Sequence, residues 1–317
     1  MIVERDYDKP AIYAQNVSKR FGSIEAARSI SLTVQRGEIF GLVGPDGAGK
    51  TTIMRLLAGV LLPDAGEIRL EGIDVVSEPE RAKSELSYMP QHFGLYDDLT
   101  VDENVLFYSK LFGISRELRR TRSEELFYAA GLFPFRKRLA GKLSGGMKQK
   151  LGLVCALIHT PRILLLDEPT TGVDPVSRRD FWAILYGLRE TGVTIFLSTA
   201  YMDEAERCTR LAMLHSGQIR YCDTPSRLKD AMPGALLAII AQDNPRVVHD
   251  ALAGAPGVLG LLLMGDRVHA RVDDAHRRET ELRARLDERA IAYGSIDRVE
   301  PGIEDVFVAL LGSQSQT

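Results

Sequence analysis

A glycine-rich segment of the chain has the residue types and the spacing of a phosphate-binding loop. Its sequence, Gly44-Pro45-Asp46-Gly47-Ala48-Gly49-Lys50-Thr51, fits the pattern G-x-x-x-x-G-K-[S/T]. Glycines let successive backbone N–H groups point into one hollow, Lys50 can neutralise phosphate charge, and the Thr51 hydroxyl can bind Mg²⁺. A turn that only began a helix would not require Lys and Thr at these positions. The pattern therefore predicts that residues 44–52, ending at Thr52, bind the phosphates of a nucleotide.

Two adjacent carboxylates follow a second apolar segment. Asp167 and Glu168 come directly after Ile163-Leu164-Leu165-Leu166. A continuous apolar run of this kind is typical of a strand that is buried on both faces of a parallel sheet. At the end of such a strand Asp167 can hold Mg²⁺ and Glu168 can polarise an attacking water. Together with the phosphate-binding loop, these two acids predict hydrolysis of a nucleotide phosphate.

The elements that carry these residues alternate between strands and helices. An apolar run at 39–43 precedes the glycine-rich turn, and apolar residues at helical spacing follow it. A third apolar run, at 193–197, is rich in β-branched and aromatic residues and ends in small polar ones. These patterns predict an α/β fold with a parallel sheet and its chemistry at the carboxyl ends of the strands.

Two regions differ from this alternating pattern. Between about residues 100 and 141 helical spacing dominates, which predicts a helical subdomain inserted into the sheet domain. The pattern changes again after the predicted sheet domain, and we expect a small α+β extension over 226–311 and a disordered tail over 312–317. Within the extension the pattern predicts apolar strands near 236–241, 258–264 and 268–272 and a charged helix over 274–290.

The composition narrows the class of protein. The chain has 317 residues, 45% of them hydrophobic and 26% charged, which is ordinary for a globular protein of about two domains. A formal net charge of −3 offers no general attraction to nucleic acid, so no nucleic-acid partner is expected. The three cysteines lack a C-x-x-C spacing and indicate a reducing cytoplasm. The N-terminus does not have the apolar core of a signal peptide, and the apolar runs are far shorter than the ~18–20 residues that span a bilayer.

A third motif points to a family. Leu143-Ser144-Gly145-Gly146-Met147-Lys148-Gln149 precedes a helix-spaced apolar run, and by itself Ser144 would be an ordinary helix N-cap. Beside the two preceding motifs, the segment resembles the signature sequence of ATP-binding-cassette (ABC) ATPases, and the resemblance is dense over 11–225. It implies a P-loop NTPase cassette with a RecA-like sheet core, a helical subdomain over about 92–159, and ATP and Mg²⁺ as ligands. In that family the signature residues, here Ser144, Gly145 and Gly146, contact ATP held by the opposite subunit of a dimer.

Other residues match further motifs of the family. Gln91 lies where ABC ATPases have a glutamine that senses Mg²⁺ and water, and Asp174 matches an aspartate at the dimer contact. Phe21 falls where the family stacks an aromatic ring on adenine, with Tyr13 as the alternative. The resemblance therefore implies Glu168 and Gln91 as catalytic residues and Thr51, Gln91 and Asp167 as residues around the metal.

One motif departs from the family. After the third strand ABC ATPases have a switch histidine that contacts the γ-phosphate and the attacking water, whereas this chain reads Ser198-Thr199-Ala200-Tyr201. Loss of one preorganised donor typically costs ~10²–10³ in rate. Because Glu168 is present, we expect a site that binds ATP and hydrolyses it slowly.

Among ABC ATPases the chain resembles bacterial multidrug and antibiotic exporter subunits, and also the first cassette of tandem exporter ATPases, where the switch histidine is likewise replaced. This resemblance implies a peripheral subunit at the cytoplasmic face of the inner or plasma membrane, bound to separate permease subunits. We expect the segment 91–99 to dock on the permease through exposed Phe93 and Tyr96. A C-terminal segment, 301–311, looks like the end of the extension that such exporter ATPases carry.

Two hypotheses about function remain open. In the first, the chain hydrolyses ATP to power an exporter of drugs or small molecules. In the second, it is the ATP-gated, weakly hydrolysing half of an asymmetric pair, in which a histidine-bearing partner cassette does most of the hydrolysis. A homodimer is the alternative to that heterodimer.

Overall fold

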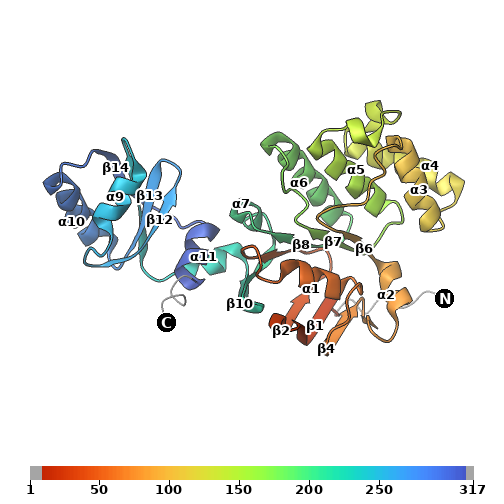
Figure 1. Ribbon diagram of the computed structural model, residues 1–317, viewed down its shortest axis with the longest axis horizontal. Helices are drawn as coiled ribbons and strands as arrows, with labels where there is room; N and C mark the ends of the chain where they lie inside the picture. The colour runs from red at the N-terminus through yellow and green to blue at the C-terminus, as the bar shows by residue number, and fades with distance from the viewer. Residues whose placement is uncertain (1–8, 312–317) are drawn as a thin grey trace. The chain divides into compact units, whose positions relative to one another are not determined.

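The computed structural model describes residues 9–311 (Figure 1). The tail expected to be disordered, 312–317, lies outside the described residues. The chain divides into two compact units, Met1–Cys222 and Asp223–Thr317, whereas the sequence analysis puts the boundary between 225 and 226. Within residues 9–311 no helix combines the length and the apolar character needed to cross a membrane.

A six-stranded sheet forms the centre of the first unit, in the order β10-β9-β3-β8-β7-β6. The neighbouring pairs from β9 to β6 are parallel. Its strands are β3 (Ile39–Val43), β6 (Leu86–Met89), β7 (Ile163–Asp167), β8 (Thr194–Thr199), β9 (Arg210–His215) and β10 (Gln218–Asp223). Every residue of β3, β7 and β8 is buried, which confirms the prediction of a parallel sheet from continuous apolar runs.

A second, antiparallel sheet of this unit was not predicted. It has the order β2-β1-β4-β5 and consists of β1 (Ile12–Phe21), β2 (Ile24–Val34), β4 (Ala65–Leu70) and β5 (Ile73–Asp74). The pairing of β1 with β2 shifts register between Ala14 and Val17 and again further along, and such irregularities blur the two-residue alternation that marks a strand. Helix α1 (Lys50–Leu57) lies between the two sheets and contacts β2, β7 and β8 (Figure 1).

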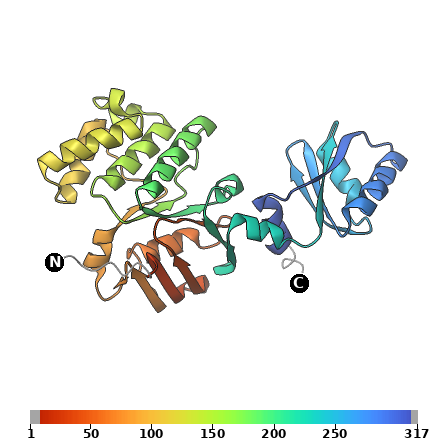
Figure 2. The ribbon, with the colours of Figure 1, turned by 180° about the vertical axis from the view of Figure 1, so that it is seen from behind.

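The predicted helical insertion lies between β6 and β7. It contains α3 (Val101–Leu111), α4 (Arg116–Ala129), the short 3-10 turns η1 (Phe133–Phe135) and η2 (Ala140–Lys142), and α5 (Gly145–Leu157). Thr100 and Glu103 form a capping box at the start of α3, which explains where that helix begins. The remaining helices of the unit are α2 (Pro79–Glu85), α6 (Pro175–Glu190) and α7 (Met202–Ala205). Helices α5 and α6 contact each other, as Figure 2 also shows.

The second unit is an α+β structure with one four-stranded antiparallel sheet, in the order β12-β13-β11-β14. Its strands are β11 (Ala235–Ala241), β12 (Val258–Met264), β13 (Arg267–Val272) and β14 (Tyr293–Val299). Its helices are α8 (Pro225–Asp230), α9 (Pro245–Leu252), α10 (Ala275–Glu288) and α11 (Ile303–Leu311). Strands β11 to β13 and helix α10 lie where the sequence predicts them. Helix α9 and strand β14 were not predicted, because α9 has only two turns and β14 buries only Ile296.

Candidate active site

The phosphate-binding loop connects the carboxyl end of β3 to α1 and packs closely against neighbouring backbone. Gly49, the N-cap of α1, has φ +107°, and a Cβ atom there would lie 2.2 Å from the carbonyl oxygen of Ala26. A Cβ atom on Gly44 would lie 2.4 Å from the carbonyl oxygen of Leu214. The glycines are therefore required by the close approach of β2 and β9 as well as by the backbone conformation.

Lys50 is held inside this loop. Its side chain is only 4% exposed, and Nζ donates to the carbonyl oxygens of Gly44 at 2.9 Å and Pro45 at 3.1 Å. Nζ also lies 3.0 Å from Oε1 of Glu168 and 3.7 Å from the exposed carboxylate of Asp46. The ammonium group of Lys50 thus contacts both the phosphate-binding loop and Glu168, the acid after β7, although these segments lie far apart in the sequence.

Asp167 is buried and held from three sides. Its Oδ1 accepts from Ser198 Oγ at 2.6 Å and from Thr51 Oγ1 at 3.3 Å, and Oδ2 accepts from the Tyr88 hydroxyl at 3.3 Å. Burial, with the Asp167 charge as a second cause, raises the pKa of Tyr88 to about 12, so this phenol stays a donor. The Thr51 hydroxyl and the Asp167 carboxylate are hard oxygen ligands of the kind that Mg²⁺ prefers, and phosphate and water oxygens would complete its octahedron. The residues present therefore fit Mg²⁺.

Glu168 has an unusual backbone that orients its side chain. Its φ of +49° is in the left-handed region, which costs a non-glycine residue about 1–2 kcal/mol. The backbone N–H donates to both the carbonyl oxygen and the hydroxyl of Ser198, at 3.1 Å each. Besides the Lys50 contact, Oε2 accepts from Gln91 Nε2 at 3.2 Å and from Thr171 Oγ1 at 3.3 Å. Strained residues of this type cluster at functional sites, where the surrounding structure holds them in place.

The structure thus brings five of the predicted residues into one cluster: Lys50, Thr51, Gln91, Asp167 and Glu168. Phe21 is located elsewhere, at the tip of the β1–β2 hairpin, where its ring is 49% exposed and Lys19 Nζ lies 5.9 Å from its centre. The alternative aromatic, Tyr13, donates its hydroxyl to Gln15 Oε1.

The signature residues lie in the helical region. Ser144 is the N-cap of α5 and accepts from the backbone N–H of Met147 at 3.3 Å. A Cβ atom on Gly146 would lie 2.4 Å from that of Ser177, so this glycine permits close packing of α5 on α6. Within the part of the chain that the structure describes, no hydrogen bond or ion pair joins residues 144–146 to the phosphate-binding loop.

The sequence analysis did not identify two side chains that organise the cluster. Ser198 and Tyr88 both bind Asp167, and Ser198 also binds the backbone of Glu168. Ser198 lies near the end of β8, the strand between β3 and β7 in the sheet. In the sequence it directly follows an apolar run, and that position could have identified it as a site residue. Tyr88 gave no signal, because an aromatic residue inside a strand is usually part of the core.

The sequence analysis also missed a buried acid that lies four residues after Ala200. Glu204, 1% exposed, accepts hydrogen bonds from the hydroxyls of Thr199 and Thr170 and from Trp182 Nε1. Arg178 Nε lies 3.6 Å from the same carboxylate. Glu204 therefore links the end of β8, the segment after β7, and helix α6.

Ala200, at the position of the switch histidine, is exposed. Its neighbour Tyr201 lies beneath Arg178, with the guanidinium carbon 4.2 Å from the ring centre. Among residues 9–311 no histidine forms a hydrogen bond with Lys50, Asp167 or Glu168. His159, for example, stacks on Phe112 instead and contacts the carbonyl oxygen of Leu86.

The segment predicted to dock on a permease is only partly exposed. Tyr96 is 46% exposed, but Phe93 packs against Gly152 and Met89 and its ring centre lies 5.1 Å from that of Tyr108. Phe93 is thus half-buried rather than fully exposed as expected, because Gly152 in α5 leaves room for its ring. Tyr96 instead contacts Phe107, a second exposed aromatic residue, edge to face at 4.6 Å.

Comparisons with known proteins show what the chain is similar to. A family model described as ABC transporter matches residues 27–171. The probable multidrug ABC transporter ATP-binding protein YbhF of Escherichia coli K12 is 40% identical over 309 residues, which cover 95% of this chain and 52% of YbhF. The chain thus spans about half the length of that relative. The daunorubicin resistance ATP-binding protein DrrA2 of Streptomyces coeruleorubidus is 32% identical over 98% of this chain and 97% of its own length.

A solved structure shows the same fold. The dimeric structure of MJ0796, a bacterial ABC transporter cassette, covers 67% of this chain and 98% of its own, with a TM-score of 0.61 and 28% identity. The predicted P-loop NTPase cassette is therefore confirmed. Since relatives with at least 30% identity match it over nearly its whole length, the chain belongs to the family of ABC transporter ATP-binding proteins.

Proposed function

We propose that this chain binds ATP with Mg²⁺ and hydrolyses it to power a membrane exporter of drugs or other small molecules. The observation that carries the proposal is the cluster at the carboxyl ends of β3 and β7, where Lys50 contacts Glu168 and Thr51 contacts Asp167. The exporter part of the proposal is supported by the names of the relatives, which refer to multidrug transport and daunorubicin resistance.

Each residue of the cluster has a distinct role in this proposal. Lys50 and the N–H groups of the loop bind the β- and γ-phosphates, with Thr52 following on the first turn of α1. Thr51 and Asp167 hold Mg²⁺, which neutralises charge on the phosphate oxygens when it is bound. Glu168, oriented by Gln91 and by its strained backbone, accepts a hydrogen bond from the attacking water. The water oxygen bonds to the γ-phosphorus as its proton passes to the Glu168 carboxylate, and the bond to the β-γ bridging oxygen breaks, which leaves ADP and phosphate.

Three further proposals concern the second cassette, the adenine ring and the membrane. The signature residues Ser144, Gly145 and Gly146 complete the ATP site of a second cassette, in keeping with their position on a different element from the phosphate-binding loop. Phe21 stacks on adenine, which its exposed ring permits. The chain acts peripherally at the cytoplasmic face of the membrane, through permease subunits that bind near Tyr96.

A second candidate function rests on Ala200. A homodimer would contain two sites without the switch histidine, whereas a histidine-bearing partner cassette would form one fully competent site. In this arrangement ATP bound to the present chain mainly closes the dimer, and the partner does most of the hydrolysis.

Phosphate release by the purified full-length chain tests the first proposal. Lys50→Ala should abolish turnover of Mg²⁺-ATP, whereas the matched control Lys83→Ala, an exposed lysine on α2, should not change it. Equal turnover by both variants and the parent would refute the assignment of the phosphate-binding loop. If only addition of a second cassette produces turnover, the asymmetric pair is the better description.

A further inference from the structure

The sheet of the second unit has two different faces. Alternate residues of β11 and β13, including Leu237, Ile239 and Val268, form a core with α9 and α10. The opposite face carries Leu236 and Ala238 of β11 opposite Arg271 and His269 of β13. Helix α11 contacts β12 and α8, and Asp305 and Val308 of this helix line a cavity on that second face.

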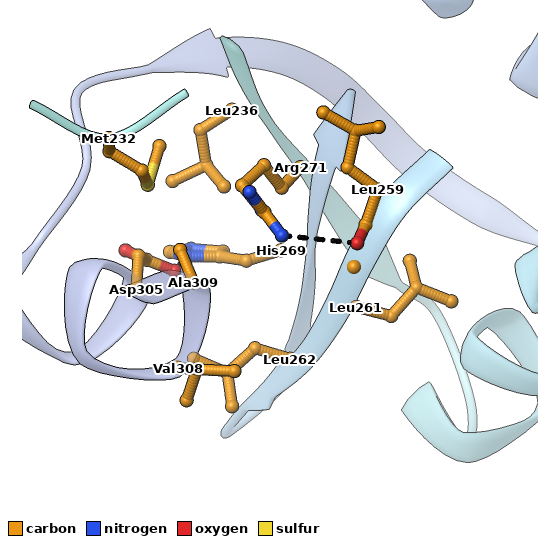
Figure 3. Close-up of a pocket in the computed structure, with 11 residues that line it drawn as sticks. Met232, Leu236, Leu259, Leu261, Leu262, His269, Arg271, Asp305, Val308 and Ala309 are labelled. Carbon is orange, nitrogen blue, oxygen red and sulfur yellow. Dashed lines mark hydrogen bonds and ion pairs between the residues drawn. The ribbon is translucent and has the colours of Figure 1, made fainter. Parts of the chain in front are cut away.

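This cavity has a volume of about 430 Å³, within the range of small-molecule sites. More of its surface is polar than apolar, but the apolar side chains of Met232, Leu236, Leu259 and Val308 are among those that line it. Three polar side chains also line it: His269, Arg271 and Asp305 (Figure 3). A hollow in which apolar side chains lie beside a few convergent polar groups is the usual form of a ligand site.

Arg271 is the side chain in this cavity that an anionic ligand would most stabilise. One guanidinium nitrogen donates to the carbonyl oxygen of Leu259 at 3.1 Å. Among the residues that the structure describes, no carboxylate forms an ion pair with Arg271, whereas Arg278 and Arg283 in the same unit pair with acids on or beside α10. Burial lowers the pKa of Arg271, which reflects the cost of withdrawing its charge from water. An anion placed in the cavity would offset that cost.

The other two polar side chains of the cavity, His269 and Asp305, do not pair with the guanidinium of Arg271. Asp305 has a side chain only 3% exposed, and its two oxygens contact His269 Nδ1 at 2.8 Å and the backbone N–H of Gly302 at 2.9 Å. Both oxygens of this acid therefore already have partners. The Asp305 carboxylate can only accept, so His269 Nδ1 donates to it, and Nε2, which has no protein hydrogen-bond partner within residues 9–311, can accept from a ligand hydroxyl or from water.

We propose that this cavity binds a small amphipathic monocarboxylate, with the carboxylate on Arg271 and the apolar body against the leucine, methionine and valine side chains. A guanidinium binds a carboxylate through two parallel hydrogen bonds, and the leucine, methionine and valine side chains that line the cavity offer contacts to a hydrocarbon or aromatic body. This binding site belongs to the second unit alone and does not depend on the proposed ATPase function.

Calorimetric titration of the full chain with decanoate, a ten-carbon monocarboxylate, tests this proposal. We expect saturable binding of one decanoate, and weaker binding of the neutral 1-decanol. Arg271→Gln should weaken decanoate binding about 10- to 100-fold, the value of a charge-assisted hydrogen bond. The matched control is Arg267→Gln, because Arg267 lies on the same strand, β13, but does not line the cavity.

Several outcomes would overturn the proposal. These are no saturable binding by the parent chain, equal decanoate affinity of Arg271→Gln and the parent, and binding of 1-decanol as tight as that of decanoate. Thermal unfolding shows whether Arg271→Gln folds. If it does not, Val308→Trp replaces it: this substitution at a half-exposed position fills the cavity, and decanoate binding that survives it refutes the site.

Discussion

The buried acid Glu204 provides a quantitative test of how the segment after β8 is held. Asp203 and Glu204 are adjacent, and each has a carboxylate oxygen 3.6 Å from a nitrogen of Arg178. They differ in burial, because the side chain of Asp203 is 60% exposed and that of Glu204 is 1% exposed. Replacing each with alanine therefore compares two ion pairs of equal length, one of them exposed and the other buried among hydrogen-bond donors.

The expected losses differ several-fold. Glu204→Ala removes the acceptor of Thr170, Thr199 and Trp182 and leaves the largely buried Arg178 without its buried partner. Breaking a buried pair in this way costs about 3–5 kcal/mol. An exposed pair such as Asp203 with Arg178 contributes about 0–1 kcal/mol. At about 2–4 °C per kcal/mol for a unit of this size, we expect Tm to fall by roughly 6–20 °C for Glu204→Ala and by at most about 4 °C for Asp203→Ala.

The single tryptophan of the chain makes the measurement specific to the first unit. Trp182 lies in α6, and its fluorescence follows the unfolding of that unit during heating or in urea. Because its indole nitrogen contacts Glu204, the emission of the folded variant will change as well, so the comparison uses the transition midpoint and is repeated by circular dichroism. Equal shifts for the two variants would refute the argument that burial makes Glu204 the important partner.

Three further predictions concern catalysis and docking. Ala200→His should raise the kcat of the isolated chain by up to ~10²–10³, the value of one preorganised donor, and an unchanged kcat would mean that another group compensates for the missing histidine. Glu168→Gln should retain bound ATP and lengthen the lifetime of the ATP-bound dimer, measured by size-exclusion chromatography. The reason is that the substitution weakens activation of the attacking water but leaves Lys50 in the phosphate-binding loop. Hydrolysis at the parent rate would exclude Glu168 as the base. A photo-crosslinker at position 96 should reach a membrane subunit in cells, whereas one at position 93 should not, because Phe93 packs against α5; cross-linking from 93 alone would reverse this assignment.

The sequence alone determined the motifs and most of the elements that carry them. The phosphate-binding pattern, the acids after an apolar run and the signature segment each depend on local spacing, and local spacing is readable without a structure. Continuous apolar runs likewise predicted β3, β7 and β8, because strands buried on both faces have no polar alternation. The strands and the long helix of the second unit followed from the same periodicities.

Only the tertiary structure decided how these pieces meet. Strand β8 lies between β3 and β7, and this order places the Ser198 hydroxyl where it binds both Asp167 and Glu168. The left-handed backbone of Glu168 could not be predicted, because nothing in the local sequence favours that conformation for a glutamate. Phe93 was predicted to be exposed, and its partial burial depends on Gly152, which lies in α5, far along the sequence. The sequence likewise gave no sign that Arg271 lines a cavity without an acidic partner among residues 9–311. That property depends on how β13, the face of its sheet and α11 pack together. Spacing along a chain fixes what each segment is, but the partners of a side chain depend on segments that are remote in the sequence.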